Sequence, residues 1–438
     1  MPRGDEAGQR RHIAIVGSGI AGLGTAWLLH KQGHAVTVFE AEPRAGGHTH
    51  TVDVTLEGIT HPVDTGFLVF NDRTYPHLIG LFAELGVTSV ASEMSFSVRD
   101  DKSGLEWAGT NLATLFARPA NAVSPAFWSM LADILRFNRT TTAALAAGTL
   151  PSTTLGEYLD AQRYRRPFRD GYLVPMAAAI WSSPAREILG FPLPTFVRFC
   201  HNHGLLTVDD RPLWRTVEGG GRVYVQKIVE RLHDVRLGCP VQRVRRRAGG
   251  VAIDSPGRPD EHFDGVVLAC HSDQALRLLA DPSADERRLL AGVRYQPNRV
   301  VLHTDAALLP RRRRAWAAWN YLAADDPDGG RPVSVSYLIN KLQPLPFATP
   351  VIVTLNPAIE PDPRAVIGEF DYSHPLLDAQ AVAAQEAIAR RQGRHDTWYA
   401  GAWLGYGFHE DGLRSAHAVA ASIATHAGQS RVPLSSAA

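Results

Sequence analysis

HIAIVGSGIAG, residues 12–22, is the stretch of this 438-residue chain that decides the fold. Its first five residues form a short apolar run, which is typical of a buried strand. Glycines 17, 19 and 22 follow with the spacing GxGxxG, and a helical pattern comes next. A second apolar run over residues 35–39 ends at Glu40. The order strand, glycine turn, helix and strand predicts a βαβ unit that binds a dinucleotide.

Each glycine of this turn has a physical role in binding a pyrophosphate. Gly17 permits the tight turn, Gly19 lets the backbone approach the phosphates, and Gly22 lets the helix pack on the strand. The helix N-terminus adds free N–H groups and the positive end of a dipole. Glu40 is placed to accept hydrogen bonds from both ribose hydroxyls and disfavours a 2′-phosphate, so NADP is not expected. On this unit alone, FAD and NAD both remain open.

A second glycine pair lies within Pro43–Thr49, shortly after Glu40, and it bears on the choice between FAD and NAD. Arg44 and the pair Gly46-Gly47 bring a cation and further N–H groups to a diphosphate. This arrangement resembles the extended fingerprint of the flavin amine-oxidase superfamily, which includes amine oxidases, protoporphyrinogen oxidase and phytoene desaturases. The resemblance implies FAD. Many relatives carry a second Arg after the glycine pair where this chain has His48, for which both a diphosphate contact and a catalytic role stay open.

Three further segments extend the predicted cofactor site. The loop VDTGF (63–67) has the pattern of a hairpin turn, and in relatives a small glycine loop at this place lies near the flavin. The resemblance also implies that the backbone of Val241 faces the adenine. A glycine-rich block over residues 398–412, before a helix predicted over 413–426, is suited to stabilise negative charge on a reduced flavin. The predicted cofactor-binding residues are Gly17, Gly19, Ile20, Ala21, Gly22, Glu40, Ala41, Arg44, Gly46, Gly47, His48, Gly66, Phe67, Val241, Ala269, Gly401, Gly407, His409, Glu410, Asp411 and Gly412.

The segment order predicts an α/β fold (α+β overall) built from two interleaved domains. A Rossmann-like FAD-binding domain of the amine-oxidase/glutathione-reductase type is expected from residues 10–85, 215–275 and 395–430. A mixed sheet-plus-helix substrate domain is expected from residues 86–214 and 276–394. Residues 1–9 and 431–438 are expected to be flexible tails.

Composition excludes several classes of protein and leaves contact with a membrane surface open. Lys and Arg number 45 and Asp and Glu 44, so the net charge of +1 argues against a nucleic-acid partner. Three distant cysteines without a CxxC motif argue against a zinc ribbon and fit a reducing compartment. No apolar run reaches the roughly 18 residues of a membrane span. We expect a cytoplasmic protein that touches the inner membrane peripherally.

Two sequence features motivate that membrane contact. Apolar side chains between Phe116 and Phe137 predict a helix with a broad apolar face. The favoured interpretation is a core helix, and the alternative is the wall of an acyl tunnel or a membrane-facing patch. Arg311–Arg314 precede Trp316 and Trp319. Such a run is usually a solvated loop, and beside tryptophans it also suits anionic headgroups.

Longer strings narrow the resemblance and span residues 12–425. They include GGHTHTVDV, VDTGFLVFNDRTYP, LWRTVEGGG, ACHSDQALRLL and GFHEDGLRSA. They are similar to bacterial flavoproteins known only as predicted NAD/FAD-binding proteins. They also resemble the N-terminal oxidase-like region of plant cyclopropane fatty-acid synthases and the desaturase of methyl-branched fatty acids in furan fatty-acid synthesis. The resemblance implies a phospholipid-linked acyl substrate and a lipid methyltransferase partner.

The expected chemistry is hydride transfer from a substrate carbon to the flavin, with a side chain taking a proton. His409, Glu410 and His48 are the predicted catalytic residues, and His271 is a further ionisable candidate near the flavin elements. No metal is predicted. Three functions stay open: an acyl desaturase or oxidase; an amine oxidase in which Tyr399/Trp403 or Tyr406/Phe408 imitate an amine cage; and a flavin-binding partner of a lipid methyltransferase.

Overall fold

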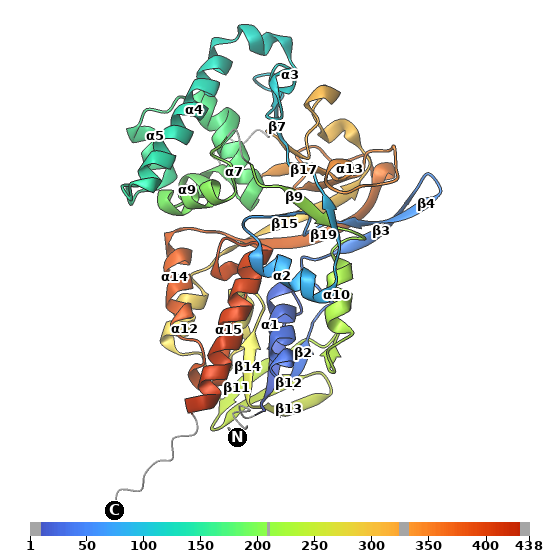
Figure 1. Ribbon diagram of the computed structural model, residues 1–438, viewed down its shortest axis with the longest axis vertical. Coiled ribbons are helices and arrows are strands. Elements are labelled where there is room, and N and C mark those ends of the chain that lie inside the picture. The colour runs from blue at the N-terminus through green and yellow to red at the C-terminus, as the bar shows by residue number, and fades with distance from the viewer. Residues whose placement is uncertain (1–9, 208–210, 324–332, 430–438) are drawn as a thin grey trace, which may run out of the picture.

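A parallel five-stranded sheet forms the half of the molecule drawn lower in Figure 1. The structure is a computed structural model that describes residues 10–207, 211–323 and 333–429, so the predicted tails lie outside it. Every neighbouring pair in this sheet is parallel, so the carboxyl ends of its strands share one edge. The strand order is β10 (Val235–Arg236), β2 (Ala35–Phe39), β1 (His12–Val16), β14 (Gly265–Leu268) and β20 (Thr397–Tyr399).

Alternation along β1 divides the core of this half into two layers. Ile13 and Ile15 pack in one cluster with residues of the helices, and Ala14 and Val16 pack in another on the opposite face. The helical layer holds α1 (Ile20–Lys31), α2 (Pro76–Leu85), α10 (Arg222–Val229) and α15 (His409–Gln429). The other layer holds an antiparallel sheet of β11 (Arg243–Arg247), β12 (Gly250–Ser255) and β13 (Arg258–Phe263), with α11 (Ser272–Leu278), α12 (Ala284–Leu290) and α14 (Ala379–Ala389).

A mixed seven-stranded sheet forms the centre of the other half. Only the pair β16 and β7 is parallel in it. The order is β19 (Val366–Pro375), β15 (Tyr295–His303), β18 (Ile352–Leu355), β17 (Ser334–Leu338), β16 (Trp319–Leu322), β7 (Phe96–Asp100) and β8 (Leu105–Ala108). Smaller pairings join β3 (Thr51–Leu56) to β4 (Ile59–Asp64), and β9 (Trp214–Val217) to β5 (Phe70–Asn71) and β6 (Ser89–Ala91).

Helices from the middle of the chain stand beside this sheet and form the upper end of the molecule (Figure 1). Pro119 and Pro125 divide the predicted apolar stretch into separate elements, because proline is suited to the first turn of a helix. The helices are α3 (Leu112–Leu115), the 3-10 turn η1 (Pro119–Val123), α4 (Pro125–Ala146), α5 (Leu155–Ala161), α7 (Val174–Trp181), α8 (Ala185–Leu189) and α9 (Leu193–Asn202).

One predicted boundary differs from the structure. The C-terminal helix begins at His409 rather than Leu413, because Asp411 lies in its first turn and accepts a hydrogen bond from the N–H of Phe408. The strand β13 was not predicted from the sequence. Its sequence, RPDEHF, lacks an apolar run, because most of its side chains are exposed.

Candidate active site

The glycine turn after β1 brings the chain unusually close to itself. Gly17 has a φ of +105°, and a Cβ on Gly22 would lie 1.9 Å from the carbonyl oxygen of Gly17. Helix α1 then begins without a side-chain cap and without an acidic residue in its first turn. A Cβ on Gly19 would meet nothing within 4 Å. The turn therefore leaves backbone N–H groups and open space at a helix N-terminus, the arrangement that holds a phosphate.

Glu40 lies at the carboxyl end of β2 and closes this turn. Its Oε2 accepts hydrogen bonds from the N–H and Oγ of Ser18, at 2.9 and 2.5 Å, and its Oε1 accepts one from the N–H of Glu42. The N–H of Gly46 donates to the carbonyl of Ser18, which brings the second glycine pair beside the first. Arg44 braces that pair, because its Nη1 donates to the carbonyl oxygen of Gly47 at 2.8 Å.

The C-terminal glycine-rich block lies against the loop after β4. The rings of Phe67 and His409 stack with centroids 3.7 Å apart. The Nε2 atom of His409 lies 2.9 Å from Thr49 Oγ1 and 3.2 Å from the hydroxyl of Tyr224. Burial lowers the pKa of His409 to about 3, so its imidazole is neutral at physiological pH. Segments that lie more than 300 residues apart in the chain thus meet here.

All these elements border one cavity of about 1050 Å³. One part of it is lined by the glycine turns and the carboxyl edge of the parallel sheet. The other part is walled by side chains of the seven-stranded sheet, of the helices above it, of β9 and of the segment before α15, and these are mainly aromatic. They include Phe96, Trp107, Tyr172, Met176, Ile180, Trp181, Phe199, Trp214, Trp319, Tyr337, Tyr406 and Phe408.

Comparison with known proteins agrees with this geometry. The family model described as flavin containing amine oxidoreductase matches residues 20–342, about three quarters of the chain. The chain belongs to this family. The family is one of flavin-containing oxidoreductases, and the residues around the glycine turns fit FAD as the cofactor. They offer uncapped helix N–H groups, open space at Gly19, and the buried Nε2 of His48, which has no hydrogen-bond partner among the described residues.

Individual relatives of this chain differ in what their names say they act on. It is 28% identical to the carotenoid phi-ring synthase of Streptomyces griseus over 66% of this chain and 58% of that protein. It is 28% identical to the putative flavin-containing monoamine oxidase AofH of Mycobacterium tuberculosis over 62% of this chain and 59% of that protein. The chain thus spans less than three fifths of the length of these relatives.

Solved structures show the same fold at lower identity. A putrescine oxidase bound to putrescine is 17% identical, with a TM-score of 0.69 over 95% of this chain and 99% of that one. A fatty acid isomerase from P. acnes is 16% identical, with a TM-score of 0.66 over 96% and 99%. These likenesses concern the fold of this chain and not its substrate.

The structure brings most of the predicted cofactor residues to the cavity wall and leaves six away from it. Residues that line the cavity are Gly17, Gly19, Ile20, Glu40, Ala41, Gly46, Gly47, His48, Gly66, Phe67, Val241, Ala269, Gly401, Gly407 and His409. Residues that do not line it are Ala21, Gly22, Arg44, Glu410, Asp411 and Gly412. Gly22 and Gly412 serve close packing instead, since a Cβ on Gly412 would lie 2.8 Å from the Ile20 side chain of α1.

Glu410, a predicted catalytic residue, has a different position from the one expected. Its carboxylate accepts hydrogen bonds from the N–H groups of His77 and Leu78, at 3.0 and 3.1 Å, and lies 2.6 Å from His77 Nδ1. It therefore satisfies the N-terminus of α2 and is turned away from the cavity. The side chain of Asp411 is likewise engaged by Phe408 N–H and Arg414, and burial raises its pKa to about 6.

Three imidazoles gather on the cavity wall, and one of them was not predicted. The ring of His48 lies 5.3 Å from that of His374 and 6.4 Å from that of His271. Burial lowers the pKa of all three, for His374 to about 4, and the neighbouring imidazoles lower that of His48 further. His374 could have been found from the alternation in β19, which places Phe370, Tyr372 and His374 on one face.

Of the two aromatic pairs suggested for an amine cage, only one lines the cavity with both of its side chains. Tyr406 and Phe408 line the cavity, with ring centroids 5.4 and 5.2 Å from that of Phe199. Tyr399 does not line it, because this residue belongs to the buried strand β20 and its hydroxyl donates to Glu286. The pair Tyr399/Trp403 is therefore not a cage in this structure.

Proposed function

We propose that this protein takes a hydride from a long hydrophobic substrate, and that it desaturates or oxidises a fatty-acyl chain. The observation that carries this proposal is the chemistry of the cavity wall. Among the described residues, the only carboxylates that line the cavity are Glu40 and Glu42, both at the nucleotide turn, and no lysine lines it. The remaining wall is aromatic and aliphatic, with Arg211 and Arg215 among its polar members. Such a wall suits an apolar chain with an anionic head, and it offers a protonated amine no counter-charge.

The two arginines have donors to spare for such a head group. Nε and Nη2 of Arg215 donate to the Oγ and carbonyl oxygen of Ser89, and Nε of Arg211 donates to the carbonyl of Thr207. A guanidinium has five N–H donors, so each retains donors for a carboxylate or phosphate after its bonds to the described residues are counted. The name of the carotenoid phi-ring synthase supports the hydrocarbon part of the proposal.

The residues at the wall have distinct parts in this reaction. FAD, when bound, supplies the acceptor for the hydride. The aromatic wall excludes water and holds the chain so that one C–H bond is oriented. Desaturation releases a second hydrogen as a proton while the carbon–carbon double bond forms, so a base must accept it. His48 and His374 are neutral imidazoles on the wall and are suited to this role, whereas Nε2 of His409 is already engaged with Thr49 and Tyr224.

Anaerobic mixing of the purified flavoprotein with candidate substrates tests the proposal. We expect loss of flavin absorbance with saturated or methyl-branched acyl lipids and none with polyamines. Arg215→Ala should raise the lipid concentration needed for half-maximal bleaching, whereas Arg364→Ala, at an exposed arginine away from the cavity, should not. Bleaching by amines alone would overturn the proposal.

An amine substrate is the second candidate, and the aromatic group of Phe199, Tyr406 and Phe408 favours it. Aromatic faces bind cations without a carboxylate. If this candidate is correct, amines will bleach the flavin, and Tyr406→Ala will weaken that reaction. A flavin that neither lipids nor amines reduce would favour the third function, a flavin-binding partner of a lipid methyltransferase.

A further inference from the structure

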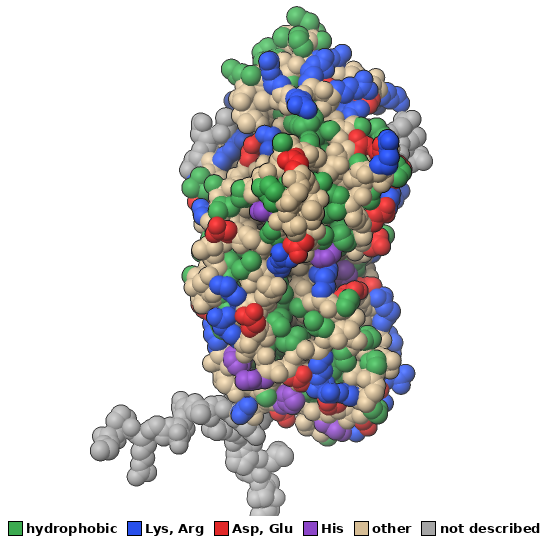
Figure 2. Space-filling model, turned by 90° about the vertical axis from the view of Figure 1, so that its right-hand side faces the viewer, with side chains coloured by type: hydrophobic (Ala, Val, Ile, Leu, Met, Phe, Trp, Pro, Cys, Tyr) green, Lys and Arg blue, Asp and Glu red, His purple; other side chains and the backbone are tan. Residues whose placement is uncertain are grey.

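An apolar surface lies at the end of the molecule farthest from the parallel sheet. Four large hydrophobic side chains are exposed there, and we call them the apolar tip: Leu112 (73% exposed), Val123 (82%), Trp128 (53%) and Leu135 (60%). They belong to α3, η1 and α4, which form the upper end of the molecule in Figure 1. Figure 2 shows hydrophobic side chains at this end and Lys or Arg side chains directly below them.

The four residues form one surface. Trp128 and Leu135 are seven positions apart on α4, so they share a helix face. The ring of Trp128 lies 5.6 Å from that of Phe116, the C-cap of α3, and its Nε1 donates to the carbonyl of Ala122 in η1. The indole is thus held in place while more than half of it faces solvent. A rigid, exposed tryptophan beside aliphatic side chains is typical of a surface that meets the interface of a bilayer.

Positive charge surrounds the tip. Residues 101–170 and 311–314 carry twelve Lys and Arg against six Asp and Glu, in a chain whose net charge is +1. The short turn η4 (Arg313–Ala315) packs against α3, which places Arg313 and Arg314 beside the segment of Leu112. Arg139 follows Leu135 by four positions on the same face of α4 and is exposed.

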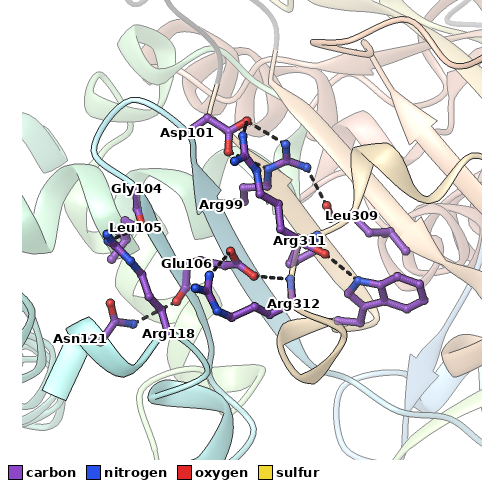
Figure 3. A network of polar contacts seen from close by, with 12 residues as sticks. Arg99, Asp101, Gly104, Leu105, Glu106, Arg118, Asn121, Leu309, Arg311 and Arg312 are labelled. Carbon is purple, nitrogen blue, oxygen red and sulfur yellow. Dashed lines mark hydrogen bonds and ion pairs between the residues drawn. The ribbon is translucent and has the colours of Figure 1, made fainter.

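The arginine run itself divides into two pairs with different roles, and Figure 3 shows the first pair, Arg311 and Arg312. Arg311 forms an ion pair with Asp101 at 3.0 Å, and Arg312 forms one with the buried Glu106 at 3.0 Å. Together with Arg99, which donates to the carbonyls of Ala307 and Leu309, they fasten this segment to the hairpin of β7 and β8. Arg313 and Arg314 are exposed, and neither forms an ion pair with a carboxylate among the described residues, so we take their charge to be available to a ligand.

The cavity reaches the same end of the molecule. Its wall includes Phe96, Trp107 and Gly109, from β7, β8 and the loop that leads into α3. Gly109 is exposed and lies three positions before Leu112. The apolar cavity thus extends to residues next to the apolar tip, which is itself surrounded by basic side chains. This combination favours a lipid over a protein as the ligand of that surface.

We propose that the apolar tip and its surrounding arginines are a docking surface for an anionic lipid bilayer. Exposed apolar side chains enter the interface, and the arginines bind acidic headgroups. Entry of an acyl substrate beside Gly109 would follow, and that consequence alone rests on the proposed function.

Sedimentation with vesicles tests the docking surface on the FAD-loaded protein. We expect binding to phosphatidylcholine vesicles that contain phosphatidylglycerol, weak binding to phosphatidylcholine alone, and a decrease with salt. Val123→Ser/Trp128→Ser/Leu135→Ser should lower the partition by about tenfold or more. Arg313→Ser/Arg314→Ser should lower it and reduce its salt dependence. Two matched controls, Leu237→Ser/Ile359→Ser and Arg364→Ser/Arg390→Ser, change exposed residues elsewhere and should bind like the wild type.

Each contrary result overturns the proposal. If wild-type protein stays in the supernatant with anionic vesicles, the apolar tip is not a bilayer-docking surface. The same conclusion follows if the triple variant binds the vesicles as fully as the wild type. A dimer that the triple variant abolishes, without vesicle binding, would assign the tip to a second copy of the chain. Melting temperature and FAD content, both expected to be unchanged, show that the variants are folded. Flavin bleaching by substrates in detergent is measured separately, so the docking surface and the proposed function can fail independently.

Discussion

Alanine substitutions at Gly19 and Gly22 should separate cofactor binding from folding. Gly19 has φ −64° and ψ 177°, which alanine adopts freely, and its Cβ would meet nothing within 4 Å. The free energy of unfolding of the apoprotein should therefore change by no more than about 0.5 kcal/mol in Gly19→Ala. The added methyl group enters the space above the helix N-terminus, where a diphosphate must approach the backbone. Overpacking of this kind costs about 1–3 kcal/mol, so FAD should bind roughly 5- to 150-fold more weakly.

Gly22→Ala should act on the fold itself. Its Cβ would lie 1.9 Å from the carbonyl oxygen of Gly17 and 3.2 Å from Cβ of Ala269, so α1 must move away from the sheet. We expect a loss of about 2–4 kcal/mol in the free energy of unfolding. Urea denaturation of the apoproteins and titration with FAD, followed by flavin fluorescence, give both quantities. Gly19→Ala protein that binds FAD like the wild type, or Gly22→Ala protein of unchanged stability, would refute this reasoning.

Three further predictions follow from buried ionisable groups. Burial raises the pKa of Asp64 to about 6 from 3.8, so this group favours folding below about pH 4 and that contribution is lost as pH rises to 6. Over this interval the free energy of unfolding of the wild-type protein should fall by about 3 kcal/mol relative to that of Asp64→Asn, as measured by denaturation. Parallel pH profiles of the two proteins would contradict this prediction. Glu410→Ala should lower the free energy of unfolding by about 1–3 kcal/mol, because the N-terminus of α2 loses its cap, and it should leave the rate of flavin reduction by substrate unchanged. Slow flavin reduction in a variant of normal stability would show that Glu410 has a catalytic role. Because burial lowers the pKa of His374 to about 4 and that of His48 as well, a proton-accepting imidazole is already neutral at pH 6, so the rate of flavin reduction should be flat from pH 6 to 8; an ionisation near pH 7 in stopped-flow measurements would point to another base.

The βαβ unit could be predicted because its signals are local. Glycine spacing, an apolar strand and a terminal acid all lie within thirty residues, and each reflects a contact made inside that segment, such as the hydrogen bonds between Glu40 and Ser18. The position of Glu410 could not be predicted in the same way. Successive helical residues point about 100° apart, so His409 at the cavity says little about where its neighbour lies. The partner that decides the position, the N-terminus of α2, is more than 300 residues away.

The histidine cluster shows the same limit more strongly. His48, His271 and His374 come from three segments, and their rings meet only because β19, the loop after β14 and the second glycine turn converge. The alternation of side chains along β19 predicts which face of the sheet His374 lies on, but it does not predict which histidines lie beside it. Likewise, the run Arg311–Arg314 has four identical side chains, yet the carboxylates of Asp101 and Glu106 engage only two of them. The run of charge therefore predicts exposure, since all four side chains are exposed, but it does not predict pairing, which depends on a distant hairpin.

The cavity separates what the family determines from what this chain alone determines. Its nucleotide end is built from backbone N–H groups and glycines, whose chemistry is the same whatever the substrate, so FAD follows from family membership. Its other end is built from side chains such as Trp107, Trp319 and Tyr337, which lie on strands of the seven-stranded sheet. Those side chains set the shape and charge that a substrate meets. The names of two relatives, a carotenoid phi-ring synthase and a putative monoamine oxidase, accordingly refer to different chemistry. In this chain the absence of carboxylates from the described aromatic wall is the physical argument for the proposed acyl substrate.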